Sequence, residues 1–261
     1  MLTIGDADLT AWVGQFFWPF LRILALFTAA PAFSSVAVPA RAKVALALIL
    51  ACLLGPVIKQ SAPVTLSWAS AILACEQVLV GLAIGFAMQL SLAAMAFAGD
   101  FIGVQMGFGF AGLLDAQNRF EVPVMSDFFG LVGLLLFIGL NGHLIMLGVL
   151  VKSFDVVPLA LGSAIPAEGW RELAGAGGML FQMGVWLALP VVAILLGTQL
   201  AVALLSRVTP QINIMSVGFS VFMWVGIAAT ITLLPFFVPA VEHVIETGLR
   251  ISGAVMTGGT P

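Results

Sequence analysis

Charged side chains are scarce in this sequence of 261 residues, since Asp, Glu, Lys and Arg together make up only 8% of it. Soluble domains carry about 25%. Hydrophobic side chains make up 62% of the chain and the mean hydropathy is +1.19, which excludes both a disordered and an ordinary soluble protein. The composition therefore predicts a protein that lies in a lipid bilayer or inside an apolar assembly.

The sequence also has few of the residues that metal, redox and hydrolytic sites need. Cys52 and Cys75 lie within apolar runs, and His143 and His243 have no cysteine or carboxylate at ligand spacing. We predict that the two cysteines are small buried hydrophobic residues and that each histidine is a hydrogen-bonded packing residue. The sequence contains no HExxH, GxSxG or phosphate-binding glycine motif, so it predicts neither an enzyme nor a metal or cofactor site. The nine basic and twelve acidic residues are scattered, which argues against nucleic-acid binding.

Six apolar segments are separated by proline, glycine and charged positions. A helix needs about 20 residues to cross a hydrocarbon core of ~30 Å. One segment is shorter than this and another is much longer, so we predict an all-α, membrane-associated subunit with about six long, partly bent helices. The segments are residues 9–30, 44–58, 66–99, 128–151, 178–206 and 212–241.

Basic residues do not indicate an orientation in the membrane. In a six-span arrangement, the Lys and Arg residues outside the segments divide equally between the two sides. Either one segment does not span the membrane or partner subunits place the chain, and the sequence leaves both possibilities open. One side would hold Arg41, Lys43, Arg119 and Arg207, and the other Lys59, Lys152, Arg171 and Arg250.

The most distinctive connection comprises residues 100–127. Its first half interleaves apolar side chains with glycines, and only its second half is polar. Because glycine permits backbone conformations that other residues resist, this segment could form a deformable constriction that excludes water. A buried turn that merely packs is the alternative. The apolar residues in question are Met106, Phe108 and Phe110, and the glycines that form the hinge are Gly103, Gly107, Gly109 and Gly112.

Prolines and glycines mark a boundary near residue 177. Beyond it, two long apolar segments are joined by the polar turn at residues 206–213, which predicts a helical hairpin over residues 178–261. We therefore divide the chain into residues 1–177 and 178–261. The hairpin is expected to bend at Pro190, Pro235 and Pro239.

Two charged residues lie within apolar segments, where charge is costly and points to function. Arg22 lies past the midpoint of the first segment, so its guanidinium must reach the interface or find a carboxylate. Glu76 lies near the start of the third segment and can be placed at an interface. We predict that these charges make structural ion pairs between subunits, in preference to a proton relay.

Glycines recur at intervals of four residues in the third segment and just after it. This spacing lets helix backbones approach closely where lipid supplies no hydrophobic driving force. It predicts helix association, within this chain or with another. The glycines are Gly81 and Gly85, then Gly99, Gly103 and Gly107.

Three motifs resemble those of the FliR family of flagellar biosynthesis proteins, and the likeness runs from end to end. It implies a pore-forming, non-enzymatic subunit of the type III export gate in the bacterial inner membrane and flagellar basal body, which passes unfolded flagellar subunits. The virulence injectisome has similar subunits. A stand-alone proton-coupled transporter using Glu76 and an assembly scaffold without a pore role are further alternatives. The motifs are GVQMGFGFAGLLD at residues 103–115, LNGHL at 140–144 and LLSRVTPQINIMSVGF at 204–219.

The resemblance also implies partners. FliR builds the gate with FliP and FliQ, and FlhB docks on it; FlhA and the basal-body ring are further expected partners. We expect a hetero-oligomer with one copy of this chain. In the family, the first part of the chain resembles FliP and the last two helices resemble FliQ, which matches the boundary at residue 177.

The resemblance finally assigns the glycine-rich loop to the pore as a plug beside a methionine gasket from FliP. Phe110 matches the aromatic position of the plug, and Met106 and Phe108 flank it. This chain has Asp115 followed by Ala116 where the family pattern leads us to expect Asp-Pro. The exit of the loop is therefore expected to be less rigid here.

Overall fold

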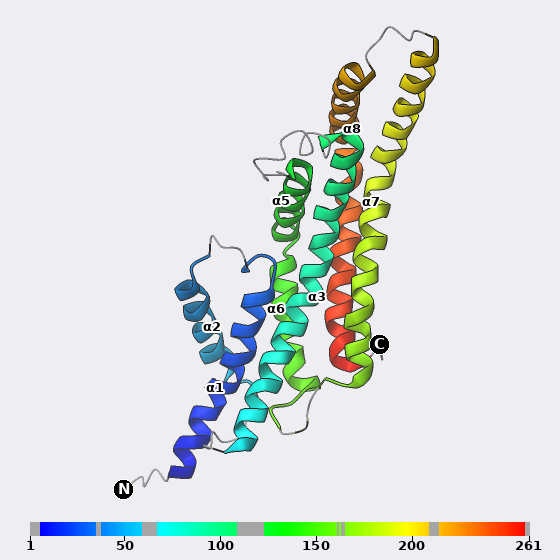
Figure 1. Ribbon diagram of the computed structural model, residues 1–261. Helices are drawn as coiled ribbons and strands as arrows, with labels where there is room; N and C mark the ends of the chain where they lie inside the picture. Colours follow the sequence, from blue (N-terminus) through cyan, green and yellow to red (C-terminus); the bar gives the residue numbers. More distant parts are fainter. Residues whose placement is uncertain are drawn as a thin grey trace. The chain divides into compact units, whose positions relative to one another are not determined.

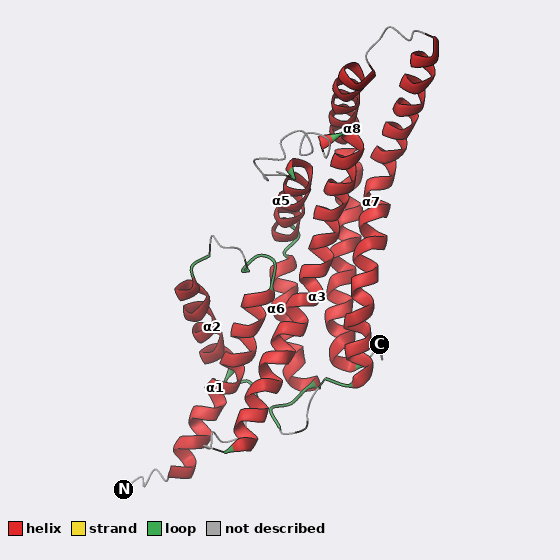
Figure 2. Cartoon of the chain, in the orientation of Figure 1, coloured by secondary structure: helices red, strands yellow, loops and turns green. Residues whose placement is uncertain are grey.

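In the part of the chain that it describes, the computed structural model consists of helices (Figures 1 and 2). It describes residues 6–34, 38–58, 67–108, 123–160, 162, 165–208 and 214–258. These residues contain no strand, so the predicted all-α class is confirmed. The helices are α1 (Asp6–Ala29), α2 (Ala40–Leu54), α3 (Trp68–Met106), α5 (Val124–Gly139), α6 (Gly142–Val156), α7 (Ala167–Val208) and α8 (Ile214–Thr257).

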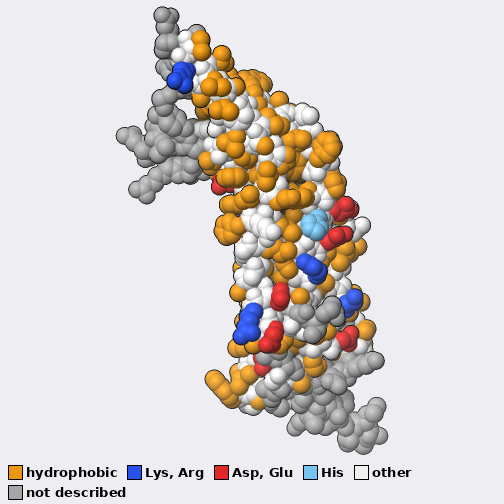
Figure 3. Space-filling view, turned by 90° about the vertical axis from the view of Figure 1, so that its right-hand side faces the viewer, with side chains coloured by type: hydrophobic (Ala, Val, Ile, Leu, Met, Phe, Trp, Pro, Cys, Tyr) orange, Lys and Arg blue, Asp and Glu red, His pale blue; other side chains and the backbone are white. Residues whose placement is uncertain are grey.

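Four of these helices are long and apolar enough to cross a bilayer, namely α1, α3, α7 and α8. Helices α5 and α6 add a fifth candidate if they form one broken span. With 15 residues, α2 is about 22 Å long, which is too short for a span. Hydrophobic side chains cover a broad part of the described surface in Figure 3, mainly in its upper half. The chain is therefore a membrane-associated helical protein, and its second predicted segment does not have the length of a span.

The fourth predicted segment is two helices instead of one. Asn141 lies between α5 and α6 with φ 57°, the left-handed conformation that asparagine tolerates better than most residues. Its carbonyl oxygen accepts hydrogen bonds from the N–H groups of Leu144 and Ile145, at 2.9 and 3.2 Å, and so starts α6. The LNGHL motif is thus the site of a helix break.

Several helices extend further than the apolar segments that predict them. Helix α7 begins at Ala167 instead of residue 178, and α8 continues to Thr257 instead of residue 241. Both run through their prolines without interruption. Helix α3 continues to Met106, so the first residues of the predicted loop are helical.

Two compact units divide the chain, and each is discontinuous in sequence. Unit 1 comprises Met1–Ser91, Ile138–Gly177 and Ile245–Pro261, and unit 2 comprises Leu92–Phe137 and Gly178–Val244. Helices α3, α7 and α8 contribute to both. The predicted division into a FliP-like part, residues 1–177, and a FliQ-like part, residues 178–261, stays a prediction.

In unit 1, α1 packs closely on α3. A Cβ atom at Gly81 would collide with the carbonyl oxygen of Arg22 and lie 2.8 Å from the Cβ of Ala25. One turn later, a Cβ at Gly85 would lie 2.8 Å from the Cβ of Ala29. Side chains at these two positions would therefore force the helices apart, as the small-residue spacing predicts.

The last turns of α8 pack on α3 within the same unit. The Ser252 hydroxyl donates a hydrogen bond to the carbonyl oxygen of Ile84 at 3.3 Å. A Cβ at Gly248 would lie 2.8 Å from the Cβ of Ser91 and 3.2 Å from the sulfur of Met88. This part of α8 is thus fixed by a polar contact and by close packing.

Candidate functional site

The end of α3 carries the part of the glycine-rich segment that the structure describes. Met106 is the last residue of the helix, and Gly107 follows it with φ +92°. Glycine adopts this conformation at little cost, so Gly107 is the point at which the chain leaves the helix. Phe108 is partly buried. Phe110, Gly109 and Gly112 lie outside the described residues.

Met106 is fully buried against α8 in unit 2. Its exposed fraction is 0%. A Cβ atom at Gly226 of α8 would lie only 2.6 Å from the Cγ and 2.9 Å from the sulfur of Met106, so the glycine makes room for the thioether. A Cβ at Gly107 would lie 3.1 Å from the ring of Phe219. Apolar contacts with α8 thus hold the last turn of α3.

A polar contact with α7 holds the same turn. The side-chain amide of Gln199 donates to the backbone carbonyl of Gln105 at 3.1 Å and to its side-chain oxygen at 3.2 Å. The last four carbonyls of a helix have no partner within the helix. Gln199 therefore satisfies one of them from a neighbouring helix, which fixes the end of α3 on α7.

Helix α5, which follows the glycine-rich segment, packs on α3 as well. A Cβ at Gly99 would collide with the carbonyl of Met125, and one at Gly103 would lie 3.3 Å from the Cβ of Met125. The Ser126 hydroxyl donates to the carbonyl of Ala96 at 2.9 Å. Gly103, a predicted hinge residue, thus lies inside α3 and faces α5. The loop is entered and left through two helices in contact.

The second candidate site is a polar cluster around Arg22 in unit 1, where Arg22 is 0% exposed. Its Nε donates to Gln77 Oε1 at 2.9 Å, and Nη2 donates to the same oxygen and, at 2.8 Å, to the carbonyl of Val157. Nη1 donates to the carbonyl and to the hydroxyl of Ser153, at 2.8 and 3.0 Å. Arginine has five N–H groups, and these five bonds use all of them.

The acceptors in this cluster are neutral. Ser153 and Val157 lie at the C-terminal end of α6, where unpaired carbonyls carry partial negative charge and attract a cation. The guanidinium carbon also lies 4.3 Å from the centre of the Phe154 ring, within the range of a cation–π interaction. Arg22 therefore joins α1 to α3 and to the end of α6.

This arrangement differs from both sequence-based expectations for Arg22, which are that its guanidinium reaches the membrane interface or pairs with a carboxylate. Arg22 donates its hydrogen bonds to Gln77, Ser153 and Val157 instead of to Glu76. The Oε2 atom of Glu76 is buried without a hydrogen-bond partner. An ion pair with another subunit would have to displace one of the existing bonds. That pairing stays a prediction.

Both cysteines predicted to be buried lie on the surface of this chain. Cys52 and Cys75 are exposed, so that prediction is wrong for the single chain. His243 is exposed too, although the sequence predicts a packing residue there. In a membrane-associated subunit, apolar helix faces meet lipid or partners instead of a core, so an apolar run does not imply burial. The described residues contain no group of three His, Cys, Asp or Glu that could hold a metal ion.

Comparison with known proteins finds relatives that match nearly the whole chain. Residues 13–248 match the model of a family described as bacterial export proteins, family 1. The flagellar biosynthetic protein FliR of Pectobacterium carotovorum subsp. carotovorum is 37% identical over 98% of this chain and 98% of its own length. The FliR proteins of Escherichia coli K12 and Bacillus subtilis 168 are 36% and 28% identical over 93% and 86% of this chain, and 93% and 88% of their own lengths.

The chain belongs to the FliR family. It is therefore a membrane-associated subunit of the flagellar export apparatus that works with other components of that apparatus. Its role is structural or in transport, since the family is not a known enzyme family.

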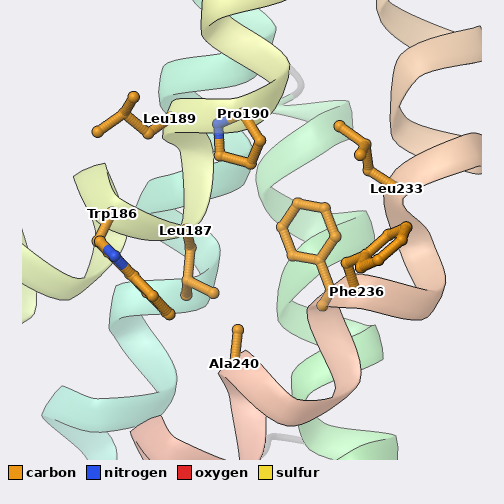
Figure 4. A pocket seen from close by; sticks show the side chains of 8 residues that line it. Trp186, Leu187, Leu189, Pro190, Leu233, Phe236 and Ala240 are labelled. Carbon is orange, nitrogen blue, oxygen red and sulfur yellow. The ribbon is translucent and has the colours of Figure 1, made fainter.

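Sequence reasoning missed two contributors to the anchor of α3. Gln199 is an uncharged polar residue within an apolar run, and Gly226 is one of many glycines. A polar or small residue in a candidate span is only a weak indication, because the sequence does not show which residue of the neighbouring helix it contacts. An apolar cavity between α7 and α8, beside Pro190 and Phe236, was also missed (Figure 4).

Proposed function

We propose that this FliR-family chain is a pore-forming subunit of the flagellar export gate, through which unfolded flagellar subunits cross the inner membrane. The observation that supports the proposal best is the anchoring of the helix that leads into the glycine-rich loop. Gln199, Gly226 and Phe219 contact the last turn of α3 or the residue after it. A plug that must close a pore requires such a fixed base.

In this proposal the loop works as an apolar seal. Phe108 and Phe110 exclude water and ions from the pore while no substrate is present. Gly107, which already has a positive φ, is the pivot about which the segment yields to an incoming polypeptide. Because apolar contacts have no fixed direction, the seal releases the substrate without breaking specific bonds.

The proposed partners are FliP-like, FliQ-like and FlhB-like subunits, with FlhA and the basal-body ring, around one copy of this chain. Large apolar side chains support such an assembly, because Phe181, Leu200 and Trp224 are 58%, 63% and 68% exposed. Exposed apolar surface of this extent is typical of subunit or membrane contacts. The flagellar relatives favour the flagellar apparatus over a virulence injectisome.

The first experiment is native mass spectrometry of the tagged chain, expressed with its neighbouring export genes and extracted in mild detergent. A discrete complex with one copy of this chain among several FliP-like and FliQ-like subunits is the expected result. A monomer or homodimer alone would overturn the proposal and favour a stand-alone transporter.

The seal itself is tested by replacing Phe108 and Phe110 with Ala. The double variant is expected to assemble normally and to let ions leak, because the two rings no longer fill the pore. Phe128→Ala is the matched control, since Phe128 is 41% exposed on α5 outside the loop. Membrane conductance in cells that make each complex gives the answer, and equal conductance in all of them contradicts the seal.

A transporter is the second candidate, and the unpartnered oxygen of Glu76 favours it. Glu76→Gln removes the proton-binding carboxylate but keeps the shape. The gate predicts that motility and export persist in this variant. Loss of both in a normally assembled complex would support the transporter instead.

An assembly scaffold makes a different prediction for the loop. Deletion of residues 108–114 leaves Met106 in its buried position. If the chain is a scaffold without a pore role, export is unaffected by this deletion. If the chain forms the gate, the deletion makes the complex leaky or stops export. The measurements are ion conductance and secretion of flagellar subunits.

A further inference from the structure

The cavity between α7 and α8 in unit 2 has a volume of about 520 Å³ (Figure 4). It lies where both helices contain a proline. Pro190 in α7 and Pro235 in α8 have no N–H group, so each helix lacks one backbone hydrogen bond beside the cavity. Figure 4 shows Leu187 and Pro190 from α7 and Phe236 and Ala240 from α8 around the same space.

The side chains that line this cavity are apolar except for the indole N–H of Trp186. Cavities of this composition stay dry and take up apolar ligands. Trp186 and Phe236 are 55% and 72% exposed, so the cavity is accessible from outside the chain. Its occupant is therefore an apolar group that enters from the surroundings.

The volume is too small to hold a helix of a partner inside the cavity. A helix with its side chains is about 10 Å in diameter, so 520 Å³ would hold only about 7 Å of it, little more than one turn. A water molecule takes up about 30 Å³ and a methylene group is of similar size, so the cavity corresponds to about 17 methylene groups. That is the size of one phospholipid acyl chain.

Polar residues follow the cavity-lining part of α8 within one helical turn. Phe236, Ala240 and His243 share one face of α8 at helical spacing, and Glu242 lies next to them. Glu242 and His243 are both exposed. A histidine ring can donate to a phosphate, and a carboxylate attracts an ammonium group but repels a net anionic headgroup.

We infer that this cavity binds one acyl chain of a zwitterionic phospholipid of the phosphatidylethanolamine type, with its headgroup at His243 and Glu242. The acyl chain fills the space beside Pro190, and the headgroup lies at the first charged residue of α8. The inference rests on the lining of unit 2 and does not depend on the proposed seal at the glycine-rich loop.

The test uses the complete export complex, purified in mild detergent and incubated with phosphatidylethanolamine that carries a photoreactive diazirine at the end of one acyl chain. Labelled peptides are mapped by mass spectrometry. Label is expected on α7 around Leu187 and on α8 around Leu233. Even labelling of all exposed apolar faces of α7 and α8 overturns the inference, as does a protein cross-link from the cavity in place of lipid.

A filling substitution makes the test specific. Ala240→Phe is expected to lower labelling at least about tenfold, because each displaced methylene group weakens binding about fourfold. Ala228→Phe adds the same ring to an exposed position of the same helix outside the cavity and is expected to leave labelling unchanged. Native mass spectrometry confirms assembly of both. Equal labelling of the two variants overturns the inference.

A surface substitution tests the headgroup without touching the cavity, in case Ala240→Phe does not assemble. Glu242→Lys reverses an exposed charge. In competition with phosphatidylglycerol, this variant is expected to shift its preference towards the anionic lipid by about tenfold or more, since a Lys attracts anionic headgroups. An unchanged preference overturns the placement of the headgroup.

Discussion

Helix α3 is held in two places by opposite means. In unit 1, Gln77 of α3 accepts hydrogen bonds from Arg22, which binds the end of α6 with its other donors. In unit 2, the last turn of α3 is held by the thioether of Met106 and one glutamine contact. Buried hydrogen bonds to a charge are costly to leave unmade, whereas a methionine side chain adapts its shape. The comparison indicates rigidity at the Arg22 cluster and adaptability at the base of the loop.

Loss of the guanidinium should have the largest effect. Arg22→Met fills a similar space but takes the guanidinium donors away from the buried oxygens of Gln77 and Val157 and leaves Ser153 O with the N–H of Val157 alone, and we expect a cost of at least about 3 kcal/mol. Arg22→Lys keeps the charge with fewer, less well-directed donors, so its effect should be intermediate. The yield and thermal midpoint of the assembled complex measure both. If Arg22→Met were as stable as wild type, the Arg22 cluster would not hold α3 rigidly.

A smaller effect is expected where the same unit depends on packing alone. Gly81→Ala places a methyl group against the backbone of α1 and should cost about 2 kcal/mol, because backbone atoms cannot move aside easily. Gly148→Ala in α6 is the matched control, since nothing lies within 4 Å of its Cβ position. That control should be neutral or stabilising by up to about 1 kcal/mol. Similar thermal midpoints for the two variants would show that α1 does not depend on this close approach.

The smallest effect on stability should come from Gly226→Ala. Its methyl group meets the flexible side chain of Met106, and we expect a cost of about 1 kcal/mol. Ion conductance should nevertheless rise, because the base of the loop shifts. Met106→Ala combined with Gly226→Ala restores the space, so a double-mutant cycle should show coupling. Gly197→Ala in α7, which meets nothing within 4 Å, is the control. Additive effects would mean that the contact does not set the loop.

Much of the fold could be predicted because apolar runs identify long helices. The ends of those helices could not. Helix α7 begins at Ala167 because Glu168, Arg171 and Glu172 are compatible with a helix outside an apolar environment, although their charges resemble a loop. The break at Asn141 has the opposite origin, since one residue in a left-handed conformation ends an apolar run that is otherwise continuous.

The candidate site was less predictable because it depends on which side chains meet. The sequence identifies Met106 and Gly107 but not their contacts with Gly226 and Phe219. Arg22 shows the same limit. A search for a carboxylate overlooks the end of α6, where the backbone carbonyls of Ser153 and Val157 receive the guanidinium. Backbone acceptors leave no trace in residue identity.

The Arg22 cluster also sets an order of events during synthesis. Its partners lie 55, 131 and 135 residues further along the chain, on α3 and at the end of α6. At a translation rate of about 5–20 residues per second, the end of α6 is made roughly 7 to 26 s after α1. Over that interval the guanidinium has no complete set of acceptors, so α1 cannot take its final place. A nascent chain that stops before α6 therefore carries a cation in its first helix without the acceptors at Ser153 and Val157.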